Sequence, residues 1–325
     1  MSAPFRPLPL TAGPHRQTLG GYFLRSRLAW PLPVEDHVVD AGAGVRLLCR
    51  CTWQPGPRDG RPALVMLHGL GGSDRSTYML STGRLAYARG WHVVRMNMRG
   101  AGDSVELCPR LYHAGLTADV LAVLNDLAPR VAHVFLAGYS LGGSVALLTA
   151  GREREQLPEG LRALAVVCAP LDLAACTASL ERPRNRAYLW HYMRSLRDGY
   201  VQRQRRAPDV FPAGVERSVH SVRAYDDRIT APHGGFAGVD DYYTRSSPGP
   251  FVAALDRPTL LIAARDDPMV PLGSVTSWPL PANGLVTREL TATGGHVGYL
   301  GRGTQAPGRF WPAERVLSFF AAQGA

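Results

Sequence analysis

The sequence contains no lysine, and each of its 36 basic residues is an arginine. With 26 acidic residues the formal net charge is +10, a balance often found in proteins that bind nucleic acids or anionic membranes. No run of arginines alternates with aromatic residues, however, and single-stranded nucleic acids need such a stacking platform. Nucleic-acid binding is therefore not expected, whereas contact with an anionic lipid surface stays open.

Cysteine is scarce, odd in number and without a C-x-x-C pair. Cys49 and Cys51 stand on either side of Arg50 in an apparent strand and so point to the same face. Buried, reduced thiols are favoured over a disulfide framework or a zinc site. The five cysteines are Cys49, Cys51, Cys108, Cys168 and Cys176.

Long apolar runs are also missing. Residues Met1 to Leu10 include three prolines and no continuous apolar stretch, so they do not form a secretory signal. No segment reaches the length of uninterrupted apolar sequence that spans a bilayer. A soluble cytoplasmic protein fits best, with at most peripheral contact to a membrane; the oligomeric state cannot be read from the sequence.

Two short stretches imitate cofactor or metal sites without matching them. Residues 97–102 follow an expected strand but lack the G-x-G-x-x-G spacing of a dinucleotide site, so no cofactor is expected. Arg99 in this stretch is expected to brace neighbouring loops. Asp240 and Asp241 have no nearby spaced ligands and indicate the start of a helix rather than a metal site.

The overall composition is that of an ordinary globular protein, with 46% hydrophobic and 19% charged residues. Short apolar runs alternate with helical segments, which predicts an α/β fold with a mostly parallel sheet flanked by helices. The expected strands are Val45–Thr52, Ala63–Leu67, His92–Met96, His133–Ala137, Leu164–Cys168, Thr259–Ala263 and Val286–Leu290. The expected helices are Thr77–Arg89, Leu116–Leu127, Leu141–Gly151 and Ala313–Ala321.

The chain is expected to divide into three parts: an arm, a core and a cap. Residues 1–34 are rich in proline, lack a sustained period and form an arm; residues 35–175 and 252–325 form the α/β core. Residues 176–251 have no obvious strand and are too long for a plain loop, so a mostly helical cap is expected over the carboxyl edge of the sheet. Its arginines and aromatic residues could bind an acyl chain and an anionic head group, or simply pack on the core and face solvent.

The stretch from Val134 to Ser144 is the most informative one. An apolar run of strand length meets Gly138-Tyr139-Ser140-Leu141-Gly142, and a helix start follows. This G-x-S-x-G pattern is typical of a nucleophile elbow, where a strand turns sharply into a helix and exposes a serine. The pentapeptide alone is a weak signal, so its context decides.

A serine hydroxyl needs a base to take its proton and a third group to orient that base. After the expected strand Thr259–Ala263 come Asp266 and Asp267, and after the last expected strand comes His296 between glycines. This order of serine, acid and histidine is that of the α/β-hydrolases. His296 is the expected base and Asp267, in an acid-x-x-Val-Pro run, the expected orienting acid; Asp266 could orient the histidine instead or cap the turn.

Two backbone N–H groups are expected to form an oxyanion hole. One belongs to Leu141, directly after the serine. The other is expected from Leu70, in the glycine-rich loop after the strand Ala63–Leu67, because glycines let the backbone approach a substrate. His68 is expected to support that loop rather than to act as a second base.

These residues resemble the YheT-like branch of the α/β-hydrolases, whose relatives include plant and animal membrane-associated lipases. The resemblance runs from residue 14 to residue 298 and implies an α/β-hydrolase fold, a carboxylester hydrolase activity, a Ser140–Asp267–His296 triad and no cofactor. Gly71 departs from the family pattern, and no counterpart of the animal relatives' N-terminal anchor is seen. The matching blocks are Pro14-His15-Arg16-Gln17-Thr18, His68-Gly69-Leu70-Gly71-Gly72, Ser76-Thr77-Tyr78, Asn97-Met98-Arg99-Gly100, residues 225–236, Asp241-Tyr242-Tyr243 and Ser246-Ser247.

The sequence therefore predicts a serine hydrolase that cleaves carboxylic esters, with lipid or acylglycerol esters among the candidates. A thioesterase, an acyltransferase or a peptidase would use the same triad, although nothing indicates a peptide-binding cleft. A non-catalytic binding protein on a hydrolase fold is the alternative from another class, and the complete serine, acid and histidine set argues against it.

Overall fold

The computed structural model describes residues 4–108 and 110–324. Residues 1–3 of the predicted arm and residue 325 of the predicted core lie outside the described residues. Within the described ranges, no helix combines the length and the apolar character that crossing a membrane requires.

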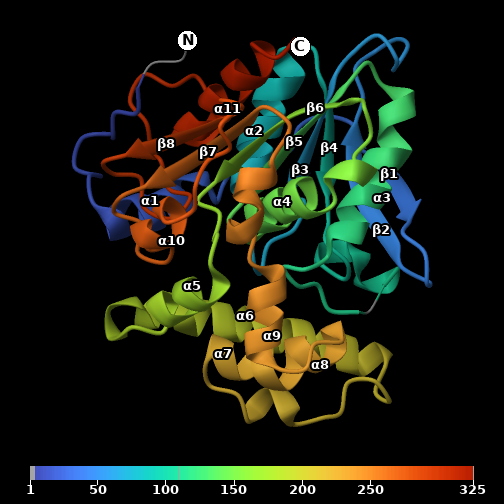
Figure 1. The fold of residues 1–325 in the computed structure, drawn as a ribbon, viewed down its shortest axis with the longest axis vertical. Helices are drawn as coiled ribbons and strands as arrows, with labels where there is room; N and C mark the ends of the chain where they lie inside the picture. Colours follow the sequence, from blue (N-terminus) through green and yellow to red (C-terminus); the bar gives the residue numbers. More distant parts are fainter. Residues whose placement is uncertain (1–3, 109, 325) are drawn as a thin grey trace.

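An eight-stranded sheet has the strand order β1-β2-β4-β3-β5-β6-β7-β8 (Figure 1). From β4 to β8 neighbouring strands run parallel, while β1 and β2 are antiparallel to their neighbours. The mostly parallel sheet is thus confirmed. The strands are β1 (Glu35–Asp40), β2 (Arg46–Thr52), β3 (Ala63–Leu67), β4 (His92–Met96), β5 (Val134–Tyr139), β6 (Leu161–Val167), β7 (Thr259–Ala264) and β8 (Val286–Thr291).

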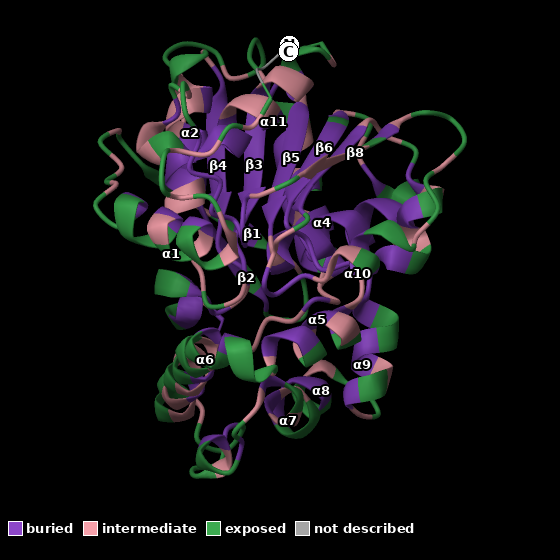
Figure 2. Cartoon of the chain, turned by 90° about the vertical axis from the view of Figure 1, so that its left-hand side faces the viewer, coloured by how far each residue is buried: buried purple, intermediate pink, exposed green. Residues whose placement is uncertain are grey.

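Helices cover both faces of this sheet, and alternate side chains of each buried strand enter different cores. In β3, Val65 joins a core with helices α3 and α4, whereas Met66 joins a core with α2 and α11. Burial on both faces explains why the central strands are continuously apolar, as the buried strands of Figure 2 show. The helices of this part are α2 (Thr77–Ala88), α3 (Thr117–Leu127), α4 (Leu141–Arg152), α10 (Leu272–Thr276) and α11 (Trp311–Ala321).

Between β6 and β7 the chain forms a layer of helices below the sheet in Figure 1. This layer has its own apolar cluster, which includes Tyr200, Phe211 and Tyr225. Asp240 and Asp241 lie in the first turn of the last of these helices, as the sequence predicts. The helices are α5 (Leu173–Leu180), α6 (Arg186–Arg206), α7 (Val222–Tyr225), α8 (Ala231–Gly234) and α9 (Val239–Ser246).

Outside the helical layer, strand β1, helix α1 and the short helix α10 were not predicted. Strand β1 (Glu35–Asp40) is a largely exposed edge strand, and its sequence EDHVVD contains no apolar run. Residues 1–34 were expected to form an arm without regular structure, but helix α1 (Pro14–Arg25) lies within them. It escaped prediction because it buries Gln17, Gly21 and Arg25 rather than an apolar stripe.

All five cysteines are buried and free, which confirms the prediction of reduced thiols. Arg99 donates through its Nε to Asp119 of α3 at 2.8 Å and is also ion-paired to that carboxylate through its terminal nitrogen. This pair fixes residues 97–102 against α3. The pair agrees with the structural role expected of Arg99, although its partner is a helix rather than a loop.

Candidate active site

Ser140 stands at the turn between β5 and α4, in a backbone conformation that is rare for a side-chain-bearing residue. Its φ is 50° and its ψ is −125°. The turn is possible because a Cβ on Gly138 would lie 2.5 Å from the Gly142 carbonyl oxygen, and one on Gly142 would lie 2.5 Å from that of His68. Side chains at either glycine would block the turn, which supports the predicted nucleophile elbow.

His296 links this serine to a carboxylate. Its Nε2 lies 2.8 Å from Ser140 Oγ, and its Nδ1 lies 2.9 Å from Asp267 Oδ2. The other carboxylate oxygen of Asp267 accepts the backbone N–H groups of Met269 and Val270 at 2.8 and 3.0 Å. With its proton on Nδ1, the imidazole donates to Asp267 and its Nε2 accepts the serine hydroxyl. The structure thus brings together the serine, the acid and the base that the sequence indicated.

Asp266, the alternative acid, faces the loop of the histidine rather than the ring. Its Oδ1 accepts the Gly295 N–H at 2.9 Å, while its Oδ2 is buried without a hydrogen-bond partner among the described residues. Burial raises the pKa of this carboxyl, and hydrogen bonds from the backbone N–H groups of Gly295 and Gly294 oppose that shift. Asp266 therefore shapes the turn that carries His296.

The glycine-rich loop after β3 lies directly against the serine. A Cβ on Gly69 would be 3.1 Å from Ser140 Cβ. The N–H groups of Gly69 and Gly71 donate to the hydroxyls of Tyr78 and Tyr112, at 2.8 and 2.7 Å. Between them, the Leu70 N–H has no acceptor among residues 4–108 and 110–324.

The Leu141 N–H, at the first turn of α4, likewise has no acceptor within the described ranges. Leu70 and Leu141 line the same cavity as Ser140. Two free N–H groups beside a serine hydroxyl are the donor set that a developing oxyanion requires. Their placement agrees with the predicted oxyanion hole.

His68 is fully buried below this loop. Its Nε2 accepts the Met98 N–H at 3.1 Å, so its Nδ1 carries the proton and donates to the Gly69 carbonyl at 2.8 Å. Burial lowers the pKa of His68 to about 4, and the ring stays neutral at physiological pH. The residue holds the loop, as expected, and has no contact with Ser140 that would make it a base.

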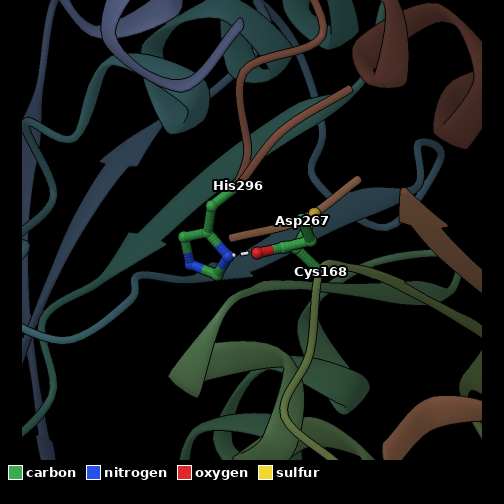
Figure 3. A group of neighbouring side chains, drawn as sticks. All are labelled: Cys168, Asp267 and His296. Carbon is green, nitrogen blue, oxygen red and sulfur yellow. Dashed lines mark hydrogen bonds and ion pairs between the residues drawn. The ribbon is translucent and has the colours of Figure 1, made fainter. Parts of the chain in front are cut away.

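Cys168 lies beside Asp267 and His296, as Figure 3 shows. One donor atom from each residue lies within 4.8 Å of the others, a spacing that a metal ion could use. The Cys168 sulfur instead accepts the Val297 N–H at 3.4 Å, and burial raises the pKa of the thiol well above its usual value. Since Asp267 and His296 are hydrogen-bonded to each other, Cys168 serves as packing and hydrogen-bonding support for the loop that carries His296.

Helix α1 supports the loop that carries His296, a role that the sequence analysis did not predict. Thr18 Oγ1 accepts the backbone N–H of His296 at 2.8 Å. Gln17 Oε1 accepts the Leu300 N–H at 2.7 Å, and the two terminal nitrogens of Arg25 each donate at 2.7 Å to the carbonyls of residues 297 and 298. The Pro-His-x-Gln-Thr block was the available signal, because it contains two of these residues.

A cavity of about 730 Å³ opens at the serine. Its floor includes Ser140 and His296, and its walls come from the helical layer between β6 and β7. Apolar and aromatic side chains such as Leu173, Tyr192 and Met269 line this cavity together with polar and charged ones. Such a cavity is large enough to bury most of a small or medium-sized organic ligand.

The comparisons with known proteins agree with this geometry. A family model described as the alpha/beta hydrolase fold matches residues 62–302. The chain is 33% identical over 270 residues to an Escherichia coli (strain K12) protein named "Putative esterase YheT", covering 81% of this chain and 78% of that one. The chain belongs to the YheT-like branch of the α/β-hydrolase family. Both the predicted fold and the predicted family are confirmed.

Other members of this family are more distant or longer. Mouse "Phospholipase ABHD3" is 31% identical to this α/β-hydrolase over 250 residues, which cover 74% of this chain and 59% of that protein. The chain therefore spans little more than half the length of this relative. Among solved structures, the esterase Pf2001 of Pyrococcus furiosus superposes with a TM-score of 0.58 at 15% identity, over 91% of this chain and 92% of its own. This likeness shows the shared fold.

Proposed function

We propose that this α/β-hydrolase cleaves carboxylic esters through a Ser140–His296–Asp267 triad and an acyl-enzyme. The observation that carries the proposal is the hydrogen-bonded line from Ser140 Oγ through His296 to Asp267, with both bonds shorter than 3 Å. Relatives named as an esterase and as a phospholipase support an ester as the bond that is cleaved. In this proposal a reactive serine, its base and the cavity that binds the ester lie in one site.

In the first half-reaction, Ser140 Oγ attacks the ester carbonyl carbon while His296 Nε2 takes the hydroxyl proton. The carbonyl oxygen gains negative charge and accepts the N–H groups of Leu70 and Leu141. Asp267 holds the imidazole in the required tautomer and stabilises its positive charge. The proton on Nε2 then passes to the leaving alcohol oxygen, the ester C–O bond breaks, and the acyl group stays on the serine.

In the second half-reaction, water takes the place of the alcohol. His296 removes a proton from the water as its oxygen attacks the acyl carbon, and the same two N–H groups stabilise the oxyanion. Collapse of this intermediate breaks the bond to Ser140 Oγ, which regains the proton from Nε2. The products are a carboxylic acid and the free enzyme, with atoms and charge balanced.

The lining of the cavity favours an ester with an apolar acyl part. Tyr192, Leu173 and Met269 contribute apolar surface to a lining that also contains polar and charged side chains. We propose that residues 176–251 act as the cap that sets acyl-chain preference, because helices α5 and α6 supply much of the wall. The apolar part of the lining favours esters with a lipid-like acyl chain over small, fully water-soluble ones.

A serine-directed fluorophosphonate probe tests the chemistry. Folded wild-type protein is expected to label at Ser140, and Ser140→Ala is expected to abolish labelling and ester hydrolysis without loss of the fold. The matched control is Ser277→Ala, which removes an exposed hydroxyl directly after α10 that donates to the Gly273 carbonyl. Absence of labelling in folded wild type would refute the hydrolase.

An ester panel graded by acyl-chain length then tests the substrate class. Activity is expected to rise from short to medium and long acyl chains as more of the cavity is filled. A preference for the shortest, most soluble esters contradicts a lipid-like substrate and leaves the triad proposal standing. Thioesters of the same acyl chains, included in parallel, distinguish an esterase from a thioesterase.

A further inference from the structure

Helix α1 exposes most of its large apolar side chains, while Gln17 and Arg25 are buried. Gln17 and Arg25 are 0% and 2% exposed, whereas Tyr22 is 54% and Phe23 66% exposed. Leu19 is exposed as well, and the spacing of residues 19, 22 and 23 places all three on one face of the helix. In a helix at a protein–water boundary the apolar stripe normally faces the core. An outward apolar face therefore indicates a non-aqueous neighbour.

The orientation of α1 is fixed by its buried contacts. Arg25 donates to the carbonyls of Val297 and Gly298, and Gln17 and Thr18 accept backbone N–H groups of residues 300 and 296. Rotation of the helix to hide Phe23 would break all of these hydrogen bonds. The exposed apolar face is thus built into the fold.

This face continues onto the start of α6. The Tyr22 ring lies 6.0 Å from that of His191, and His15 Nδ1 lies 3.0 Å from the Tyr188 hydroxyl. Trp190, which directly precedes His191 in α6, is 65% exposed. Figure 2 shows α1 above α6, with exposed stretches along both helices. We name the set Leu19, Tyr22, Phe23 and Trp190 the mouth surface.

The mouth surface adjoins the entrance to the catalytic cavity. Trp190 and His191 line that cavity together with Ser140. A molecule that covers the mouth surface therefore also faces the route to the serine.

Arginines dominate the charge around the mouth surface. Residues 14–27 contain no acidic residue, and Glu181 is the sole acid among residues 181–197. Of the exposed arginines on these segments, five have no ion-pair partner among the residues that the structure describes, while Arg194 pairs with Asp198 at 3.8 Å. The five are Arg16, Arg27, Arg182, Arg184 and Arg186.

We propose that the mouth surface docks this α/β-hydrolase on an anionic phospholipid bilayer. The aromatic and leucine side chains would enter the head-group region, where such residues partition, and the arginines would bind lipid phosphates. A second copy of this chain is a poor occupant, because two arginine-rich surfaces would oppose each other. The part of the inference that concerns delivery of a membrane ester to Ser140 rests on the proposed function; the docking itself does not.

Vesicle co-sedimentation of the full chain tests the proposal. Binding to vesicles of phosphatidylcholine mixed with phosphatidylglycerol is expected to exceed binding to pure phosphatidylcholine by about tenfold, and to weaken with added salt. The double variant Tyr22→Gln/Phe23→Gln is expected to reduce the partition coefficient by about tenfold, because glutamine keeps helix propensity but removes the apolar surface. Its hydrolysis of a short soluble ester is expected to match the wild type.

Matched variants control for general loss of apolar area or charge. Leu280→Gln changes an exposed apolar residue outside both helices and is expected to bind vesicles like the wild type. Arg16→Glu is expected to weaken binding, whereas Arg89→Glu, at the end of α2 before β4, is expected to have little effect. Equal binding by the Tyr22→Gln/Phe23→Gln variant and the wild type, or no preference for anionic vesicles, overturns the proposal.

Two further measurements separate docking from catalysis and from self-association. Ser140→Ala is expected to bind vesicles like the wild type, so docking without fluorophosphonate labelling of the wild type would sink the hydrolase and leave the docking surface in place. Labelling of the wild type without vesicle binding would refute the docking surface and leave the hydrolase proposal standing. If sedimentation equilibrium instead shows a wild-type dimer that Tyr22→Gln/Phe23→Gln converts to a monomer, the mouth surface is a contact between copies and the proposal is wrong.

Discussion

Thr18→Val is expected to slow catalysis although Thr18 lies outside the proposed triad. The Thr18 hydroxyl donates to the Pro14 carbonyl at 2.7 Å, which directs its lone pairs towards the His296 N–H at 2.8 Å. Valine has nearly the same shape and offers no acceptor. A buried N–H left without a partner costs about 1–3 kcal/mol. If that cost is added to the activation free energy because His296 leaves its reactive position, kcat decreases by about 5-fold to 150-fold, since about 1.4 kcal/mol corresponds to tenfold.

The assay measures kcat and KM on a soluble ester, together with the thermal melt. Because Thr18 positions His296 and does not line the cavity, kcat is expected to fall while KM stays nearly constant. Thr18→Ser keeps the hydroxyl and is expected to restore most of the rate. Thr276→Val, which removes a hydroxyl bonded to the Leu272 carbonyl in the exposed helix α10, controls for the substitution itself. Equal rates for Thr18→Val and wild type, or an equally slow Thr18→Ser, would refute the reasoning.

Two other predictions concern charge. Asp267→Asn is expected to lower kcat by about 10⁴-fold while the fold is kept, because the imidazole loses its oriented tautomer; a decrease of less than tenfold in steady-state assays contradicts that role. Burial raises the pKa of Asp226 from 3.8 to about 6. Between these pH values the unfolded carboxyl is ionised while the folded one keeps its proton, so the free energy of unfolding falls as the pH rises, by an amount on the order of 3 kcal/mol. Asp226→Asn is therefore expected to raise the melting temperature at pH 8 and not at pH 4; an equal shift at both values would exclude this linkage.

The fold was predictable wherever local pattern and burial agree. Strands β3 and β4 have the predicted bounds because their continuous apolar runs are buried on both faces. Helices α2 and α3 differ from the prediction by a single residue at one end. The edge strand β1 was not predicted because it contains charged residues, which are tolerated where one side of a strand faces water.

The candidate site was predictable because each of its residues stands in a short, recognisable sequence pattern. Ser140 needs glycines at 138 and 142, and the acid and the base each follow a strand whose end lies at the same edge of the sheet. Asp267 was separable from Asp266 only by a short local pattern, which the hydrogen bond to His296 now supports.

By itself, the sequence determined the buried strands of the sheet and the order of serine, acid and histidine along the chain, because strand periodicity and turn chemistry depend on neighbouring residues. Tertiary structure alone decided what helix α1 does. Thr18 meets His296 across 278 positions of the chain, and that contact turns the polar face of the helix inward and its apolar face outward. No local pattern encodes such an inversion, because its cause is a set of backbone groups supplied by a distant loop.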